Sequence, residues 1–349
     1  MQTGGFMPSS GIQSARYSRQ TRFGGLGQTG QERLAQARVA IVGLGATGST
    51  IAHGLLRAGI GYLRLIDRDW VETHNLPRQS FYTEADADQL QPKVVAAKAH
   101  AQQINSACEI DAVVLDLHAG TIDQALAGVD LVMDGSDNLE TRLLINQWCV
   151  REQVPWIYSG VLGGHGMTAN FRPQQACWRC LFVTSPDPGS MPTCETAGVV
   201  GPVVGVIGNL AATEALKLLS AQGQANPDLL MLDLWAWQFE HLPMPAPRPD
   251  CPVCGLRQFD LLDQASEPTI SLCGRNAIQI RPQQPTTIGL ARLAQQLQQA
   301  DLRVVQTDYL LRFAAETYQA TVFPDGRVIV SGTDDPAVAR GFYTRWINH

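Results

Sequence analysis

The feature that most constrains the fold of this chain is an apolar run that enters a glycine-rich turn. Residues 39–42 (Val-Ala-Ile-Val) precede Gly43-Leu-Gly-Ala-Thr-Gly48, and residues 49–58 have the composition of a helix. The next predicted strand, 63–67, ends in Asp67. A strand, a Gly-x-Gly-x-x-Gly turn, a helix and an acidic strand end are together typical of a nucleotide-binding β-α-β unit. The candidate nucleotide-binding residues are therefore Gly43, Gly45, Gly48 and Asp67.

A group of polar residues follows that a dinucleotide-dependent oxidoreductase does not need. Asn75-Leu-Pro-Arg-Gln79 and Gln91-Pro-Lys93 place Asn75, Arg78 and Lys93 just beyond the predicted ribose-binding strand. Cations at this point suit a triphosphate better than a nicotinamide. The chain has no Gly-x-x-x-x-Gly-Lys loop, so any phosphate-binding cations must come from these positions or from elsewhere in the sequence.

Strand-like and helix-like segments alternate through the first half of the chain. These segments are residues 28–36 (helix), 110–117 (strand), 131–137 (strand) and 138–151 (helix). The alternation predicts a Rossmann-like, doubly wound α/β fold with a mostly parallel sheet and helices on both faces. Because ligands of such sheets lie beyond the carboxyl ends of the strands, the strand ends at Gly43, Asp67 and Asp137 are expected to border one crevice.

The pattern changes after Pro155. Antiparallel strands are predicted at one side of the sheet over 156–160, 167–171 and 229–240, and beyond Gly255 the sequence becomes rich in Gln. We expect a disordered tail at 1–15, a main domain over 16–257 and a small α+β domain over 258–349. The elements predicted for the small domain are residues 277–281 (strand), 288–300 (helix), 304–313 (strand), 317–330 (strands around the turn Pro324-Asp-Gly326) and 336–347 (helix).

Charge and hydropathy limit the class of partner. The net charge of -6, with both signs scattered, provides no basic surface for nucleic acid. The N-terminus lacks the pattern of a secretion signal, so a cytoplasmic location is the default expectation. The longest apolar run, 198–219, contains Pro202, Asn209, Glu214 and Lys217, which favours a buried or interface helix over a membrane span.

Two cysteine pairs predict a metal site. Cys177-Trp-Arg-Cys180 and Cys251-Pro-Val-Cys254 are CxxC pairs that lie far apart in the sequence. Each CxxC turn presents two thiolates on one side of a loop, and two such turns complete a tetrahedral structural Zn²⁺ site. A redox role is disfavoured because neither pair lies between a predicted strand and helix. Cys108, Cys149 and Cys273 are expected to be buried or incidental thiols.

Several of these motifs occur together, and in the same order, in one known family. The chain resembles the ThiF/MoeB/HesA group, relatives of ubiquitin-activating enzymes that adenylate the C-terminal glycine of small ubiquitin-like sulfur carriers. The resemblance covers residues 16–255. The motifs that carry it are Arg16-Tyr-Ser-Arg-Gln20, the Gly43 turn, Asp67-Arg-Asp69, Asn75-Leu-Pro-Arg-Gln79, Gln91-Pro-Lys93, Ser136-Asp-Asn138, both CxxC pairs and Thr193-Cys-Glu-Thr-Ala-Gly198.

The resemblance implies an adenylyltransferase that uses ATP and Mg²⁺ and carries Zn²⁺. The three glycines would form the turn over the nucleotide and Asp67 would bind the ribose. The resemblance also implies that Asn75, Arg78 and Lys93 bind the triphosphate. Asp137 would coordinate magnesium, with Asn138 beside it in the nucleotide site. Arg19 would contact the phosphates from the second subunit of a homodimer. Considered one at a time, Arg78 and Lys93 could equally be solvated surface charges, and Asp137 could be the cap of a helix. Asp69 and Gln79 are assigned only as structural partners of their loop.

Cys194 lies where relatives carry a thiol that can link covalently to the carrier, and the resemblance makes it a candidate catalytic residue. The chain shows no sulfurtransferase domain, which implies a separate sulfur donor. The segment from Gln258 is similar to an extension of some longer members, and we hypothesise that it recruits the carrier or the donor.

Other functions remain open from the sequence. They are a threonylcarbamoyl-adenosine tRNA dehydratase of the same superfamily, an NAD-dependent oxidoreductase and an inactive scaffold paired with an active relative. The two CxxC pairs and the acidic net charge disfavour a tRNA substrate. Arg78, Lys93 and Asp137 disfavour an oxidoreductase. The intact motifs disfavour a scaffold. The pathway, thiamine or molybdenum cofactor synthesis among others, is not specified by the sequence.

Overall fold

The computed structural model describes residues 15–183, 194–263, 269–272, 276–282 and 286–347. The chain divides into two compact units, one of residues 1–186 and 198–264 and the other of residues 187–197 and 265–349. The expected tail at residues 1–15 lies almost wholly outside the described residues.

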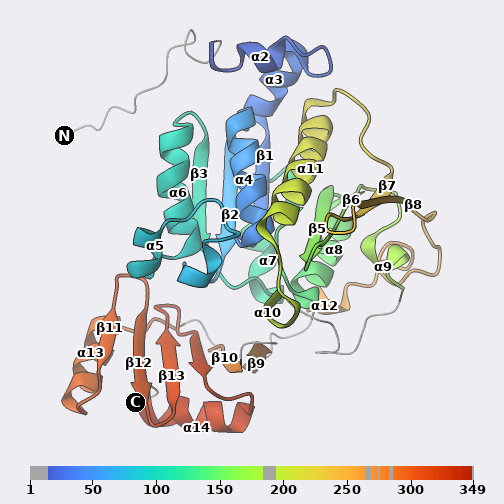
Figure 1. Ribbon diagram of the computed structural model, residues 1–349. Coiled ribbons are helices and arrows are strands. Elements are labelled where there is room, and N and C mark those ends of the chain that lie inside the picture. Colours follow the sequence, from blue (N-terminus) through green and yellow to red (C-terminus); the bar gives the residue numbers. More distant parts are fainter. Residues whose placement is uncertain (1–14, 184–193, 264–268, 273–275, 283–285, 348–349) are drawn as a thin grey trace. The chain divides into compact units, whose positions relative to one another are not determined.

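The first unit is built on one eight-stranded sheet in the order β3-β2-β1-β4-β5-β6-β7-β8 (Figure 1). Strands β1 to β5 are parallel, and β6 to β8 are antiparallel to their neighbours. The strands are β1 (Arg38–Val42), β2 (Tyr62–Asp67), β3 (Glu109–Val114), β4 (Leu131–Asp134), β5 (Trp156–Leu162), β6 (His165–Phe171), β7 (Asp228–Asp233) and β8 (Gln238–Pro243). The predicted α/β class, with antiparallel strands at one side, is confirmed.

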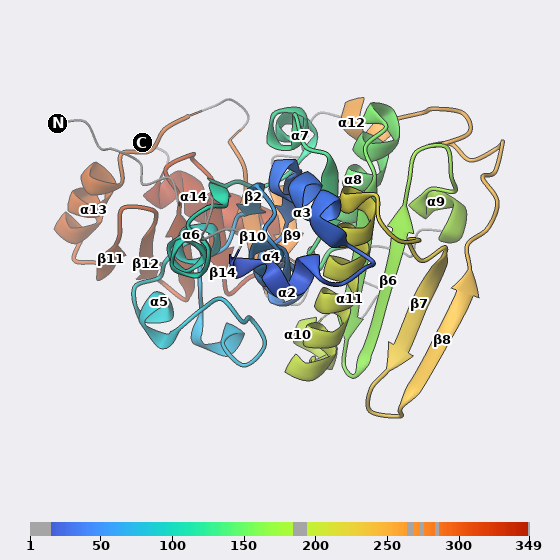
Figure 2. The same ribbon diagram turned by 90° about the horizontal axis from the view of Figure 1, so that it is seen from above.

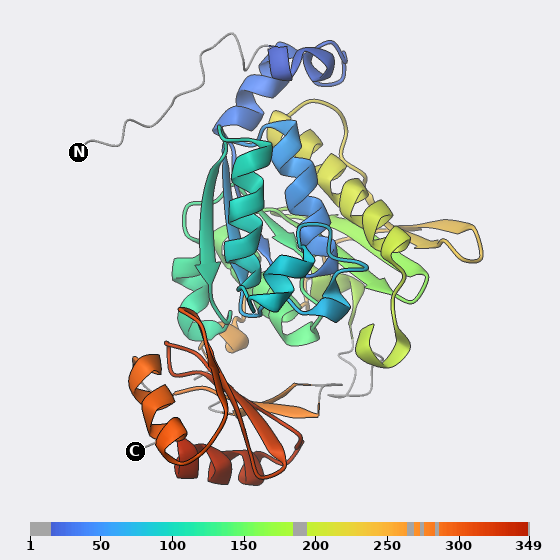
Figure 3. The same ribbon diagram turned by 60° about the vertical axis from the view of Figure 1, so that its left-hand side comes forward.

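Helices cover both faces of this sheet. Helices α4 (Ala46–Ala58), α6 (Lys93–Ile104) and α11 (Gly201–Ser220) lie side by side over one face (Figure 3), and α7 (Ala119–Leu126) and α8 (Leu139–Glu152) lie on the other (Figure 2). Side chains alternate along β1, so that Val39 and Ile41 pack beneath α4 while Ala40 and Val42 pack towards α7 and α8. Two apolar layers therefore fix the sheet and its strand ends.

Helix α11 has the length and composition of a membrane span, with 20 residues and a mean hydropathy of 1.4. Half of its apolar window is nevertheless buried inside the unit. Val203 and Ile207 are fully buried, and Ala211 joins the core that α4 forms with the sheet. These contacts agree with the predicted packed helix.

Short helices complete the first unit. They are α2 (Ser18–Thr21), α3 (Gly27–Gln36), the 3-10 helix η1 (Thr73–Asn75), α5 (Glu84–Asp88), α9 (Trp178–Leu181) and α12 (Asp260–Asp263). Helix α12 packs on α8, where the Gln147 carboxamide donates to Asp260 Oδ1 at 2.7 Å and accepts from the Leu261 N–H at 3.0 Å. The hypothesis that the C-terminal segment recruits the carrier or the donor should therefore be tested with a deletion that begins after residue 264 rather than at residue 258.

The second unit contains a six-stranded antiparallel sheet in the order β11-β12-β13-β14-β10-β9. Its elements are β9 (Thr269–Leu272), β10 (Ala277–Ile280), α13 (Leu290–Gln299), β11 (Val304–Gln306), β12 (Leu311–Ala315), β13 (Tyr318–Val322), β14 (Val328–Ser331) and α14 (Pro336–Trp346), together with α10 (Cys194–Ala197). Leu293 of α13 and Phe342 of α14 pack on Phe313 and Val330 of the sheet.

One predicted strand of the second unit is wrong as a single element. Residues 304–313 form two strands, β11 and part of β12, which pair with each other across a turn. Thr307 donates its backbone N–H to Leu310 O at 2.9 Å, and its hydroxyl accepts from the Leu310 N–H at 3.1 Å. These local hydrogen bonds of a Thr side chain close the turn where the apolar pattern alone suggested a continuous strand.

Candidate nucleotide site

The glycine turn joins β1 to α4 at the carboxyl edge of the parallel strands (Figure 1). Gly43 has a φ of +84°, and a methyl group at this position would lie 2.7 Å from Gly135 O. A methyl group on Gly48 would lie 1.8 Å from Gly43 O. Both glycines are therefore required by close backbone packing within the turn.

Gly45 differs because its surroundings are open. Gly45 is the N-cap of α4, and the nearest atom to a methyl group built on it, outside its own chain neighbours and helix backbone, is Gln79 Nε2 at 3.8 Å. The free backbone N–H groups and the positive dipole end of α4 border this space. A helix N-terminus of this kind favours a bound phosphate.

Asp67 at the end of β2 holds the glycine turn in place. Its Oδ2 accepts a 2.6 Å hydrogen bond from the Leu44 N–H, and its Oδ1 accepts from the Asp69 N–H at 2.7 Å. Tyr82 donates its hydroxyl to Leu44 O at 2.7 Å from the other side. Burial raises the pKa of the Asp67 carboxyl, and the nearby Lys93 ammonium opposes that rise.

Lys93 and Asn75 lie buried near these strand ends. Lys93 is the first residue of α6, and its Nζ is 3.3 Å from Asp69 Oδ2. Asn75 ends η1, and its Oδ1 accepts from the Glu72 N–H at 3.0 Å. Arg78 is half-buried and donates from Nη1 to His74 O at 2.5 Å. The structure thus brings Lys93 to Asp67 and Asp69, and places Arg78 next to Gln79, the residue that faces Gly45.

The loop after β4 carries Asp137. Strand β4 ends at Asp134, whose Oδ1 accepts from both the N–H and the hydroxyl of Ser136, at 2.9 and 2.6 Å. Asp137 is exposed, and its charge acts on the half-buried Arg142 and on Arg68. Helix α8 is capped by Asn138, whose Oδ1 accepts from the Thr141 N–H at 2.8 Å. The capping alternative considered for Asp137 therefore belongs to Asn138.

Two ion pairs that were not predicted from the sequence support this edge of the sheet. Arg142 Nε lies 2.8 Å from Asp134 Oδ2, and Arg68 Nη1 lies 2.9 Å from Asp116 Oδ1. Burial lowers the pKa of Arg142, but the neighbouring Asp134 carboxylate and Tyr158 hydroxyl together raise it above its ordinary value. No local motif marks these pairs, because Arg68 and Asp116 lie 48 residues apart and Arg142 reaches Asp134 from the helix that follows β4.

Arg19 lies at the opposite end of the unit. Its neighbour Gln20 donates to Ala58 O, at the end of α4, at 2.7 Å, and Arg16 donates to Ile104 O, at the end of α6, at 2.9 Å. The site at Gly45 is at the other end of α4, roughly 20 Å away for a helix of this length. Figure 1 shows α2 at the edge remote from the strand carboxyl ends. Arg19 is therefore not brought to the nucleotide site of its own chain.

Cys194 begins α10, a short helix of the second unit. Its side chain and residues 184–193 lie outside the described part of the structure. The chemical role considered for Cys194 stays a prediction.

The two CxxC pairs come together as predicted. The four sulfur atoms of Cys177, Cys180, Cys251 and Cys254 lie within 4.8 Å of one another, with Cys177 Sγ and Cys251 Sγ 3.7 Å apart. Thiolates about 2.3 Å from a Zn²⁺ ion lie roughly 3.8 Å apart in a tetrahedron. The donor set therefore fits a structural zinc site.

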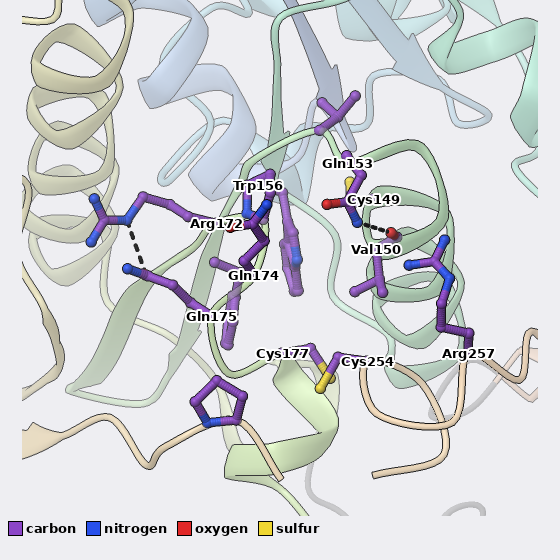
Figure 4. A pocket seen from close by; sticks show the side chains of 14 residues that line it. Cys149, Val150, Gln153, Trp156, Arg172, Gln174, Gln175, Cys177, Cys254 and Arg257 are labelled. Carbon is purple, nitrogen blue, oxygen red and sulfur yellow. Dashed lines mark hydrogen bonds between the residues drawn. The ribbon is translucent and has the colours of Figure 1, made fainter. Parts of the chain in front are cut away.

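A pocket of about 170 Å³ lies beside the cysteine cluster, between the end of α8, the start of β5 and the turn after β6 (Figure 4). Cys177 and Cys254 form part of its wall. Arg172 and Arg257 lie on opposite sides of the pocket, and Arg172 donates from Nε to Gln175 Oε1 at 3.0 Å. None of the candidate nucleotide-binding residues lines this pocket, so it is separate from the site at Gly45.

The fold and the glycine-turn site define a nucleotide-binding α/β protein of the Rossmann-like class. Comparison with known proteins narrows this class. Residues 17–253 match the ThiF family, and the chain belongs to that family.

Relatives and solved structures agree with this assignment. The chain is 37% identical over 337 residues to the sulfur carrier protein ThiS adenylyltransferase of Bacillus subtilis, covering 96% of this chain and 99% of the relative. It is 38% identical to the Escherichia coli protein of the same name, over 69% of this chain and 94% of the relative. It is 37% identical to the molybdopterin-synthase adenylyltransferase of Salmonella typhimurium, over 69% and 96%. The microcin C7 biosynthetic enzyme MccB has a similar fold, with a TM-score of 0.62 at 23% identity over 71% of this chain and 77% of MccB.

Proposed function

We propose that this protein adenylates the C-terminal glycine of a ubiquitin-like sulfur-carrier protein with ATP and releases pyrophosphate. The observation that carries the proposal is the placement of Gly45, Asp67 and Lys93 at one strand edge of a chain whose relatives are named adenylyltransferases. Since the Bacillus subtilis relative matches along its whole length, a ThiS-type carrier is the first substrate to test.

The chemistry needs alignment more than a strong base. A peptide carboxylate is ionised at neutral pH and attacks the α-phosphorus of ATP directly. The new bond joins a carboxylate oxygen to the α-phosphorus, and the bond to the β-phosphate oxygen breaks, so that pyrophosphate leaves with both bonding electrons. Charge builds up on the phosphates in this step, and fixed cations lower its energy.

The position of each residue supports the role that we propose for it. The N-terminus of α4 beside Gly45 receives phosphate, and Asp67, already oriented by Leu44 and Asp69, accepts from the ribose hydroxyls. Lys93, Arg78 and Asn75 hold the triphosphate. The loops that carry these residues are held by backbone hydrogen bonds, among them Arg78 N–H to Asn75 O at 3.1 Å and Lys93 N–H to Asp69 O at 2.9 Å.

Asp137 and the cysteine cluster are assigned to metals. The exposed Asp137 carboxylate beyond β4 is an oxygen donor of the kind that Mg²⁺ prefers. Bound Mg²⁺ would neutralise charge on the phosphates. The four cysteines would hold Zn²⁺ in a closed structural site that ties the segment after β6 to the segment after β8.

The position of Arg19 supports a homodimer in which this residue completes the partner's site. Within one chain Arg19 is held at the wrong end of α4, so a phosphate contact requires a second subunit. A protein substrate is supported by the exposed aromatic side chains of the β7–β8 hairpin, where Trp235 and Trp237 are 87% and 77% exposed. We place the reaction in the cytoplasm, with sulfur supplied to the activated carrier by a separate donor.

The test is exchange of labelled pyrophosphate into ATP in the presence of Mg²⁺ and one carrier at a time. Exchange is expected with a Gly-Gly-ended carrier of the ThiS or MoaD type and not in its absence. No exchange with any such carrier would refute the proposed function.

A further inference from the structure

The pocket beside the cysteine cluster carries positive charge without a matching carboxylate. Its described lining residues include Arg172 and Arg257, and none of them is Asp or Glu. Each guanidinium donates one hydrogen bond to a described residue, at 3.0 and 3.4 Å, and keeps other N–H donors for a further acceptor. Cys177 and Cys254 also line the pocket, and bound Zn²⁺ would offset the charge of their thiolates. The wall therefore favours an anionic ligand.

Trp156 adds a donor that has no acceptor. It lines the pocket and is 1% exposed, and its Nε1 has no hydrogen-bond partner among the described residues. An indole N–H can only donate, and buried polar groups in native proteins are almost always paired. Figure 4 shows Trp156 and Arg257 on two sides of the pocket, with Val150 between them. A ligand oxygen at the inner end of the pocket would supply the missing acceptor.

The remaining wall is largely apolar, which indicates a ligand with a hydrocarbon body. The rings of Trp156 and Phe171 stack with their centroids 4.7 Å apart, and Val150, Val154 and Pro173 complete the apolar lining. The volume of about 170 Å³ is far larger than the roughly 10–15 Å³ that a single water needs. A free inorganic anion would leave this apolar surface unused, whereas an organic acid would cover it.

The backbone around the pocket is held in an uncommon conformation. Gln153, Gln174 and Arg257 all line the pocket and have left-handed φ values of +57°, +64° and +55°. Such values are uncommon for residues other than glycine, and they cluster at ligand sites. Arg257 follows the turn of the second CxxC pair, where Leu256 donates its N–H to Cys251 O at 2.8 Å. The loop that carries the two cysteines therefore holds Arg257 at the wall.

We propose that this pocket binds a small organic carboxylate. The carboxylate group accepts from the Arg257 guanidinium and from the Trp156 indole N–H, and the hydrocarbon body lies against Phe171 and Val154. The site is independent of the proposed function, because none of the candidate nucleotide-binding residues lines the pocket. Loss of adenylation and loss of carboxylate binding are therefore separate results.

Titration of the full-length protein with benzoate, benzamide and inorganic phosphate tests the proposal, with the tryptophan indole N–H signals followed by NMR. Benzoate should shift the Trp156 signal saturably, and Trp156→Phe identifies that signal by its absence. Benzamide has the same size without the charge and should bind at least tenfold more weakly. Phosphate has the charge without the hydrocarbon body and should not shift the signal.

A pair of arginine variants shows where the carboxylate lies. Arg257→Ala removes an exposed side chain and should lower benzoate affinity at least tenfold. The matched control is Arg151→Ala, since that neighbouring guanidinium already forms ion pairs with Asp123 and Glu152. The control should bind benzoate within twofold of wild type.

Three results would overturn the proposal. They are no saturable shift with benzoate, equal affinities for benzoate and benzamide, and a benzoate affinity of Arg257→Ala within twofold of wild type. If a variant does not fold, the comparison of the three ligands on the wild-type protein decides. An indole signal that responds to benzoate but to neither of the other two supports the site, and equal responses to all three refute it.

Discussion

Arg142 and Asp134 form a partly buried ion pair next to the loop that carries Asp137. The Arg142 Nε lies 2.8 Å from Asp134 Oδ2, and its Nη2 donates to Ser136 O at 2.9 Å. The same guanidinium therefore neutralises the end of β4 and fixes the backbone of the following loop. Asp134 is fully buried, so its charge depends on this partner.

Arg142→Ala should lower the free energy of unfolding by about 3–5 kcal/mol, because it leaves the Asp134 carboxylate buried and uncompensated. The double variant Arg142→Met with Asp134→Asn removes both charges and should recover much of that loss. Urea unfolding at pH 7 measures both. If the free energy of unfolding of Arg142→Ala lies within about 1 kcal/mol of the wild-type value, roughly the cost of an ordinary substitution, the ion pair does not hold this strand end.

The glycines of the turn should respond differently to alanine. Gly48→Ala places a methyl group 1.8 Å from Gly43 O and should prevent stable folding. Gly45→Ala meets no such obstacle, so it should fold normally but weaken ATP binding by about tenfold or more, because the methyl group occupies the approach to the helix N-terminus. Thermal denaturation and ATP titration distinguish the two. Normal ATP affinity in Gly45→Ala would place the phosphates elsewhere.

The cysteine cluster should contain one zinc ion per chain. Cys254→Ser removes one of four thiolates, so the zinc content should fall to near zero and the melting temperature should drop, because a structural zinc site contributes directly to folding. Cys149→Ala is the control, since Cys149 is a nearby buried thiol outside the cluster. Elemental analysis of the purified proteins gives the answer. A wild-type chain without zinc, or a Cys254→Ser chain that retains it, would contradict the assignment.

Asp67 should make the nucleotide-free protein less stable as the pH rises. Burial raises the pKa of this carboxyl in the folded state above its ordinary value of 3.8. The folded state then holds the proton more tightly than the unfolded chain, so the stabilisation is fully present below pH 3.8 and is lost as the pH rises through the folded pKa. Asp67→Asn lacks this titration. The difference in unfolding free energy, wild type minus variant, should therefore decrease from acidic to neutral pH. An increase would mean that Lys93 outweighs burial.

The sequence was sufficient to predict the fold class, because the glycine turn and the alternation of strands and helices are local patterns. It also predicted the cysteine cluster, since thiols in CxxC pairs have few other uses. The supporting contacts were not predictable in this way. Tyr82 meets Leu44 only after segments 38 residues apart pack together, and Arg142 reaches Asp134 only once α8 packs beside the end of β4. The turn at Thr307 depends on one side chain competing for backbone hydrogen bonds within an otherwise strand-like run.

Carrier-dependent pyrophosphate exchange tests the central claim most directly. The wild-type protein should exchange labelled pyrophosphate into ATP with an intact Gly-Gly-ended carrier but not with the same carrier lacking its last glycine. Arg78→Ala and Asp137→Ala should fold and lose exchange, while Arg57→Ala, an exposed change near the other end of α4, should retain it. Exchange that ignores the carrier terminus, or full activity of Arg78→Ala and Asp137→Ala, would contradict adenylation of a carrier glycine at this site.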